Sequence, residues 1–372
     1  MKGKLQVAFI ILTLAGLALP IVRFNKSGTV SKKENRMLAT RPPLIRDGYL
    51  NNTLFSQYSA YFDDRFGGRQ RLISLNSAVN NMLGANTVVA NDKAIKGKDG
   101  WYFYISSIDG DNLSDFYKRN LFTEEQYADF KRRVASTAAW CAEQEIPCIF
   151  LVCPNKHSVY SEHYLFERPA GITRADQITA AFEECGVPYL FPRDFLLSKK
   201  ADYDVPLYHE CGTHWNQLGA YLAATLLKSK IEECLPNILF PHINYSITDS
   251  YPSTDDSILG MLGLKADVDK STRVVVEPNG HIHADFYEYL KNDGRNGVHT
   301  KGADKRLPRA LIFRDSFFTA LEPFMSPLFS EAEYIWKQFR EEDKELVLQY
   351  KPDIIIFQAV ERYAPSICDG AF

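Results

Sequence analysis

The feature of this sequence that most restricts its fold is the alternation of amphipathic helices with short, continuously apolar segments. The run Cys148–Cys153 follows Pro147 and contains no charged or amide side chain. Such a run is typical of a strand that is buried on both faces of a sheet. Further strands are predicted at 187–191, 310–313 and 353–357. Helices that alternate with strands of this kind predict an α/β fold with a mostly parallel sheet flanked by helices.

The helices between these strands have recognisable first residues. Thr123 and Gln126 have the spacing of a capping box, and apolar residues follow at helical spacing to about residue 144. A second helix is predicted over about 173–185, with Thr173 as its cap. A third is predicted to begin directly after Asn216.

The N-terminal segment predicts attachment to a membrane. The apolar run Leu5–Val22 follows two lysines, and as a helix it would span roughly 27 Å, close to the thickness of the hydrocarbon layer. We favour an uncleaved signal anchor over a cleaved signal peptide. Positive charges after the run argue for the opposite orientation, but a short basic start before an apolar run is typical of export signals. We therefore expect a single-pass inner-membrane protein with its remaining chain in the periplasm, divided into an anchor (1–24), a stalk and N-terminal extension (25–85) and an α/β domain (86–372).

The charge balance and the cysteines exclude some functions. The chain has 43 Lys and Arg against 46 Asp and Glu, with a net charge of −3, so nucleic acid is not expected as a partner. The 7 cysteines are an odd number, so at least one would stay unpaired in an exported monomer. No C-x-x-C pair and no zinc-protease spacing occurs, and we expect neither a metal nor another cofactor.

Two residues with reactive side chains lie at the boundaries of predicted strands and helices. Ser316 follows the strand at 310–313, at the sheet edge where α/β proteins collect their active sites. It lacks the glycines of a G-x-S-x-G elbow. A serine here can be a nucleophile, with the N–H of Phe317 as an oxyanion donor, or it can simply cap a helix. His214 stands just before the helix that Asn216 caps, where an imidazole can be a general base or a structural histidine.

Four more candidate residues lie next to these predicted strands and helices, and each has two interpretations. Asn155 and Lys156 follow the first strand, so they can supply an amide to an oxyanion and a cation to a carboxylated sugar, or form a turn with a solvated lysine. Arg314 can contact substrate or brace its loop. Trp215 can stack on a sugar ring or support His214 from a buried position.

Eight short motifs occur in order along the chain. They are Glu34-Asn35-Arg36-x-Leu38-Ala39, Asp64-Arg65-Phe66, Gly100-Trp101-Tyr102-Phe103-Tyr104, Pro154-Asn155-Lys156, Thr213-His214-Trp215-Asn216, Met261-Leu262-Gly263-Leu264, Asp315-Ser316-Phe317 and Glu361-Arg362-Tyr363. Together they closely resemble the alginate O-acetyltransferase AlgX/AlgJ-type family, over about residues 30–365. The resemblance implies an SGNH-hydrolase-like (flavodoxin-like) domain whose nucleophile motif follows its histidine motif. It also implies an exported protein that acetylates hydroxyls of a surface polysaccharide beside a multi-spanning membrane O-acyltransferase.

Carried over by position, Ser316 would accept the acetyl group and His214 would be its general base. The family's acid stands two residues before the histidine, where this chain has Gly212. Three possibilities follow: another acid, Glu210 or Asp315, reaches His214; a Ser–His dyad works with reduced power; or the domain is a silent polysaccharide-binding or scaffold protein.

The sequence thus predicts a membrane-anchored O-acetyltransferase that acetylates an exopolysaccharide or cell-surface glycan through a serine acyl-enzyme. Its expected partners are the polysaccharide acceptor, the membrane through residues 5–22, and a membrane-bound O-acyltransferase that delivers the acetyl group. The alternatives are an exported serine esterase acting as a carbohydrate deacetylase, which would use the same groups with water as acceptor, and the silent binding protein. The motif arginines Arg36, Arg65 and Arg362 are expected to form structural ion pairs.

Overall fold

The chain divides into two compact units, residues 1–89 with 257–265 and residues 90–256 with 266–372, in a computed structural model. The residues that the structure describes are 13, 24–26, 30–31, 36–46, 49–51, 54–67, 93–107, 109–252, 257–262, 272–279, 284–290 and 296–368. Each unit is described by itself.

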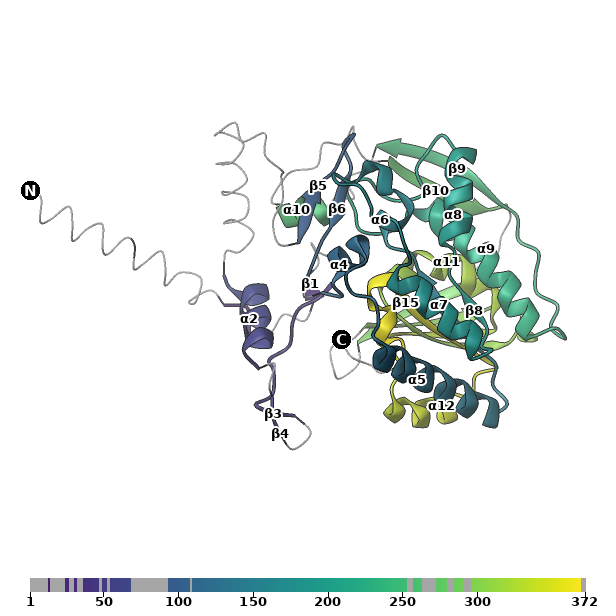
Figure 1. Ribbon diagram of the computed structural model, residues 1–372. Helices are drawn as coiled ribbons and strands as arrows, with labels where there is room; N and C mark the ends of the chain where they lie inside the picture. The colour runs from purple at the N-terminus through teal and green to yellow at the C-terminus, as the bar shows by residue number, and fades with distance from the viewer. Residues whose placement is uncertain are drawn as a thin grey trace, which may run out of the picture. The chain divides into compact units, whose positions relative to one another are not determined.

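A sheet lies at the centre of the larger unit (Figure 1). Its seven described strands have the order β11-β12-β14-β13-β15-β7-β8. The strands are β7 (Cys148–Cys153), β8 (Tyr189–Leu190), β11 (Ala284–Leu290), β12 (Asn296–Gly302), β13 (Arg309–Arg314), β14 (Glu331–Trp336) and β15 (Ile354–Val360). The five strands from β14 to β8 pair in parallel, whereas β12 is antiparallel to both β14 and β11. The predicted α/β class is confirmed, with a mixed sheet.

Alternate side chains of the parallel strands enter two separate cores. Along β7, Ile149, Leu151 and Cys153 pack on one face and Cys148, Phe150 and Val152 on the other, all buried. The second face is covered by α5 (Glu124–Glu143), α7 (Arg174–Glu184) and α12 (Lys344–Tyr350), and the first by α8 (Arg193–Lys199), α9 (Gln217–Cys234) and α11 (Glu322–Met325). Burial on both faces explains why these strands are continuously apolar in the sequence.

The predicted helix starts are confirmed. Thr123 and Thr173 each form a capping box at the start of α5 and α7. The side chain of Asn216 accepts hydrogen bonds from two backbone N–H groups at the start of α9. At Gly219, in the first turn of α9, a Cβ atom would lie 2.2 Å from the carbonyl oxygen of Leu207. Only glycine therefore allows α9 to begin so close to the chain that leads to His214.

Further elements complete the larger unit. They are the antiparallel pairs β5 (Ala94–Lys96) with β6 (Tyr102–Tyr104) and β9 (Tyr245–Pro252) with β10 (Thr272–Pro278), the helices α4 (Asn112–Tyr117) and α6 (Lys156–Val159), and the 3₁₀ helices η1 (Ser161–His163), η2 (Lys200–Asp202), η4 (Ser316–Ala320), η5 (Ser326–Leu328), η6 (Glu341–Asp343) and η7 (Glu361–Ser366). Two of them, η4 and η7, directly follow β13 and β15 at the carboxyl edge of the sheet.

The smaller unit contains helices and two short antiparallel pairs. They are α2 (Leu54–Arg65), α10 (Ser257–Leu262), β1 (Val30–Ser31) with β2 (Arg36–Met37), and β3 (Ile45–Arg46) with β4 (Tyr49–Leu50). Buried Arg65 donates to the carbonyl oxygens of Ala39 (3.0 Å) and Asn25 (3.1 Å). The side chain of Arg65 thus joins three segments of chain through backbone carbonyls, and within the described residues it does not form the ion pair expected from the sequence.

The anchor predicted for residues 1–24 lies outside the described residues, apart from Thr13 and Phe24. In the part of the chain that the structure describes, no helix combines the length and the apolar character needed to cross a bilayer. No disulfide joins any of the seven cysteines, all of which are described.

Candidate active site

Ser316 and His214 lie in contact at the carboxyl edge of the sheet. Ser316 is the first residue of η4, two residues after β13 ends. His214 lies in a loop that the bridge between Tyr208 and Trp215 closes, directly before α9. The Nε2 atom of His214 is 2.8 Å from the Oγ atom of Ser316. This is hydrogen-bond distance, as a nucleophile and its general base require.

The other ring nitrogen of His214 contacts a hydroxyl. The Oγ1 atom of Thr213 is 2.9 Å from Nδ1 of the imidazole. Each ring nitrogen of His214 thus contacts a hydroxyl group. One hydroxyl belongs to the preceding residue and the other to a residue 102 positions further along the chain. Thr213 was not singled out in the sequence, where it appears only as part of the histidine motif.

Trp215 is a buried support for the pair, as one of its two interpretations stated. Its side chain is 1% exposed, and its Nε1–H donates to the carbonyl oxygen of Phe317 at 3.0 Å. The ring of Phe317 lies 4.8 Å from the imidazole of His214. Trp215 therefore fixes the histidine loop to η4, and stacking on a sugar ring is wrong for a side chain this deeply buried.

Asp315 has a structural role and is not the acid partner of His214. Its carboxylate accepts hydrogen bonds from the backbone N–H of Phe317 (2.8 Å), the amide of Gln358 (2.9 Å) and the backbone N–H of Val360 (2.6 Å). Burial raises the pKa of this carboxyl above its usual value. These contacts cap η4 and fasten it to β15. They also occupy the N–H of Phe317, so the prediction that this N–H faces an oxyanion is wrong for the arrangement seen here.

Glu210, the other candidate acid, is directed toward β10. Its Oε2 atom accepts from the backbone N–H of Thr272 at 3.0 Å.

Lys156 holds the loop that carries His214 in place. Its Nζ atom donates to the carbonyl oxygens of His209 (3.0 Å), Glu210 (3.1 Å) and Gly212 (2.6 Å). The lysine is 4% exposed, so neither predicted role, binding a carboxylated sugar or standing solvated in a turn, is correct. The contacts of Lys156 with backbone carbonyls could not be predicted from the sequence, because every residue has a carbonyl oxygen and such contacts leave no pattern.

Asn155 keeps a side-chain donor available. Its Oδ1 atom accepts from Arg362 at 3.3 Å, and its backbone N–H donates to Glu361 at 2.8 Å. The Nδ2 atom is buried and has no hydrogen-bond partner in the described part of the chain. An amide N–H held this way, at the sheet edge that carries Ser316, suits an oxyanion donor.

Arg362 is held among aromatic rings. Its guanidinium lies over the rings of Tyr104 (5.3 Å), Tyr363 (4.8 Å) and Phe317 (5.8 Å). The carboxylate of Asp109 accepts hydrogen bonds from the hydroxyls of both tyrosines. Arg362 thus connects Asn155 to the residue after Ser316, where the sequence analysis expected only an ion pair.

Arg314 braces the loop and is buried away from any substrate. Its side chain is 2% exposed and forms an ion pair with Glu322 at 2.8 Å. It also donates to Thr319 at 3.1 Å and lies over the ring of Trp336 at 4.6 Å. Of its two interpretations, bracing is therefore correct.

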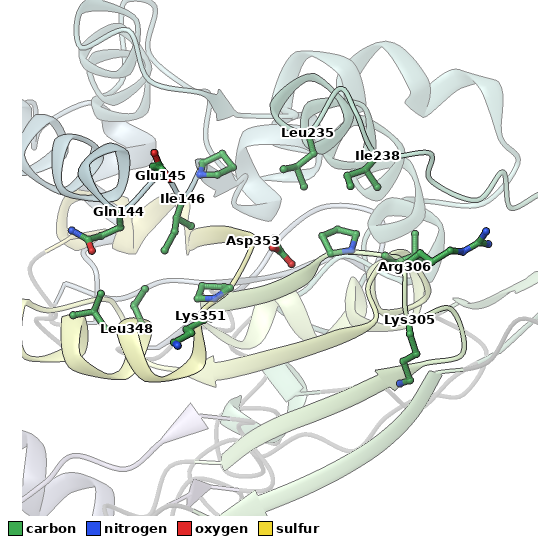
Figure 2. Close-up of a pocket in the computed structure, with 15 residues that line it drawn as sticks. Gln144, Glu145, Ile146, Leu235, Ile238, Lys305, Arg306, Leu348, Lys351 and Asp353 are labelled. Carbon is green, nitrogen blue, oxygen red and sulfur yellow. The ribbon is translucent and has the colours of Figure 1, made fainter.

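A pocket of about 780 Å³ lies elsewhere, at the amino edge of the sheet (Figure 2). Its wall includes Pro147, Pro308 and Asp353, which directly precede β7, β13 and β15. Because Ser316 follows the opposite end of β13, this pocket does not belong to the Ser316–His214 site.

Comparison with known proteins gives one family. Residues 94–261 match the family model described as SGNH hydrolase-like domain, acetyltransferase AlgX. No curated protein matches the chain.

The solved structures that resemble the chain include the following three. PatB1 of Bacillus cereus, also solved with a sulfonyl adduct, is 12% identical over 74% of this chain and 97% of its own, with a TM-score of 0.52. A DHHW family protein of Eubacterium siraeum is 12% identical over 77% of this chain and 98% of its own, with a TM-score of 0.51. The O-acetyltransferase domain of Pseudomonas putida AlgJ is 16% identical over 74% of this chain and 93% of its own, with a TM-score of 0.48.

At these identities the first two structures show a shared fold. The family match itself covers His214 and ends before Ser316. The resemblance inferred from the sequence is confirmed over residues 94–261, which are similar to the SGNH hydrolase-like domain of the AlgX acetyltransferase family.

Proposed function

We propose that this protein is an exported, membrane-anchored O-acetyltransferase that transfers acetyl groups to hydroxyls of an exopolysaccharide or cell-surface glycan through an acyl-enzyme on Ser316. The observation that carries the proposal is the 2.8 Å contact between His214 Nε2 and Ser316 Oγ. A silent binding domain has no need for a nucleophile and a base in hydrogen-bond contact at the edge where α/β sheets carry their active sites.

The first half of the reaction loads the enzyme. Ser316 Oγ attacks the acetyl carbonyl of the donor while its proton passes to His214 Nε2. The negative charge that develops on the carbonyl oxygen is stabilised by the free Nδ2–H of Asn155. When the tetrahedral intermediate collapses, the donor's oxygen leaves with the proton from His214, and the acetyl group stays on Ser316.

The second half runs the same steps toward the sugar. A glycan hydroxyl gives its proton to Nε2 and attacks the acetyl carbonyl, and Ser316 Oγ departs and regains that proton. If water took the place of the sugar hydroxyl, the same residues would hydrolyse the ester. A membrane-bound O-acyltransferase is our proposed source of the acetyl group. We also propose that residues 5–22 anchor the protein in the membrane, with its catalytic domain on the periplasmic side.

The test combines acylation and transfer in the full-length protein. The enzyme is incubated with an activated acetyl ester, and peptide mapping by mass spectrometry locates the acetyl group. A sulfonyl fluoride serves as a second probe, because PatB1 has been solved with a sulfonyl adduct. We expect label on Ser316, none in Ser316→Ala or His214→Ala, and full labelling in the control Ser198→Ala, which changes an exposed serine on α8.

The molecule that accepts the acetyl group distinguishes a transferase from an esterase. Release of the acetyl group onto an added acidic oligosaccharide supports the transferase. Release to water at the same rate with and without oligosaccharide supports an esterase. Absence of label on folded protein with either probe contradicts the acyl-enzyme proposal.

A further inference from the structure

Helix α2 of the smaller unit presents a row of aromatic side chains to solvent. The exposed fractions are 88% for Phe55, 43% for Tyr58 and 41% for Phe62. Because these residues follow one another at spacings of three and four, they lie along one side of the helix, which we call the aromatic face of α2. Single exposed apolar residues are ordinary on protein surfaces, whereas several in one row are typical of an interaction surface.

The chain that precedes this unit is fastened to the same helix. The ring of Phe24 lies 5.6 Å from the rings of both Tyr61 and Phe62. The backbone N–H of Asn25 donates to the carbonyl oxygen of Arg65 at 2.8 Å, and the Arg65 side chain donates to the carbonyl oxygen of Asn25 at 3.1 Å. Residues 24 and 25 are therefore held against the last turns of α2.

The membrane anchor of the proposed function limits how far this helix can lie from the bilayer. The apolar run ends at Val22, two residues before Phe24. Because one residue of chain spans at most about 3.6 Å, Phe24 lies within about 7 Å of the hydrocarbon layer. The headgroup region of a bilayer is about 5–8 Å thick on each side. Phe24 thus lies at the depth of the headgroups, and Phe62 packs directly against it.

We propose that the aromatic face of α2 lies in the interfacial layer of the membrane that holds the anchor. Phenylalanine and tyrosine rings are favourable at this depth, where the ring is buried among headgroups and upper acyl chains. Exposed Lys26, two residues after Phe24, brings a cation to the same level, where lipid phosphates can bind it. The short connection to the anchor favours lipid over a protein partner, which would have to fit between α2 and the bilayer. This inference rests on the anchor of the proposed function.

The test places a fluorescent ring on α2 of the full-length protein. The protein is reconstituted in vesicles of phosphatidylethanolamine and phosphatidylglycerol, some of whose acyl chains carry bromine near the headgroups. Phe55→Trp puts an indole on the aromatic face, and Asp63→Trp is the matched control. Asp63 is exposed on the same helix but lies about 100° around it from Phe62. The four tryptophans of the unaltered protein all belong to the larger unit, and their emission is measured separately and subtracted.

We expect the added emission of Phe55→Trp to lie at shorter wavelength than that of Asp63→Trp, and bromine to remove most of it while removing little from the control. Equal quenching of the two variants overturns the inference. Emission at short wavelength that bromine leaves unchanged also overturns it, because a protein partner or another part of this chain would then cover the ring.

Extraction of the vesicles with alkaline carbonate tests the anchor separately. Release of the unaltered protein contradicts the proposed anchor, and with it the inference that depends on it. Retention of the protein together with an unquenched indole at position 55 contradicts the inference alone and leaves the proposed function standing.

Discussion

Removal of the buried ammonium of Lys156 should loosen the loop that carries His214. In Lys156→Met, three carbonyl oxygens, those of His209, Glu210 and Gly212, each lose a charged donor that now lies 2.6–3.1 Å away. A hydrogen bond from a charged group contributes about 1.5–3 kcal/mol, so three contribute roughly 5–9 kcal/mol. The variant no longer has to bury an ammonium ion, which offsets several kcal/mol of this sum. We expect the free energy of unfolding to fall by about 2–4 kcal/mol.

The same change should also reduce catalysis. The base has to stay within hydrogen-bond distance of Ser316, and a displacement of about 1 Å can cost on the order of a hundred-fold in rate. We therefore expect kcat to fall about a hundred-fold in Lys156→Met while most of the protein remains folded.

Lys200→Met is the matched control. Lys200 also donates to a backbone carbonyl, that of Val159 at 2.8 Å, and pairs with exposed Glu162 at 2.6 Å. Because this pair is near solvent, its loss should cost no more than about 1 kcal/mol. Urea unfolding gives the two free energies, and hydrogen exchange of residues 209–212 reports the loop directly. Equal unfolding free energies in the two variants, with unchanged exchange at the loop, would show that Lys156 does not hold it.

Three further changes test other contacts. Glu322→Ala leaves the buried Arg314, now 2.8 Å from its partner, without that carboxylate and should destabilise the protein by about 3–5 kcal/mol in urea unfolding; a loss below about 1 kcal/mol contradicts this. Burial raises the pKa of Glu333 to about 7 from 4.5, so its contribution to stability is full below pH 4.5 and is lost as the pH rises toward 7. Glu333→Gln should flatten that decline in Tm, and parallel curves would refute the assignment. Arg362→Met frees the Oδ1 atom of Asn155, so kcat should fall at least tenfold, and the double variant with Asn155→Ala should be no slower than Asn155→Ala alone, whereas additive losses would separate the two residues.

Strands buried on both faces could be predicted from the sequence, and paired polar strands could not. The run Cys148–Cys153 forms β7 with the predicted bounds, because a strand between two cores must be apolar at every position. In contrast, β14 was not predicted, since glutamates alternate with apolar residues along it. One of these glutamates, Glu333, lies 3.0 Å from His299 on β12, and another, Glu331, lies 3.4 Å from Arg309 on β13. Charges that neighbouring strands neutralise look like surface residues until the sheet is assembled.

The candidate site could likewise be predicted only in part from the sequence. Position at the end of a strand was enough to place Ser316 at the carboxyl edge of the sheet, and the family resemblance paired it with His214. The 2.8 Å contact between the two side chains agrees with that pairing. The sequence did not show what the nearby cations do. Lys156 and Arg314 were given possible contacts with substrate, but their partners are backbone carbonyls and a buried acid. Every residue has a backbone carbonyl oxygen, so a side chain that binds carbonyls leaves no pattern in the sequence.

The strand order also constrains how this chain can be synthesised and folded. β15, formed by residues 354–360, lies between β13 and β7, which are made earlier, and it pairs with both. Its backbone and Gln358 hold Asp315, next to Ser316. The central sheet therefore stays divided until the last strand has left the ribosome, and the apolar edges of β7 and β13 are exposed in every shorter nascent chain. A chain that ends before residue 354 should be recognised by chaperones and proteases as unfolded, so only complete molecules can acquire the paired serine and histidine.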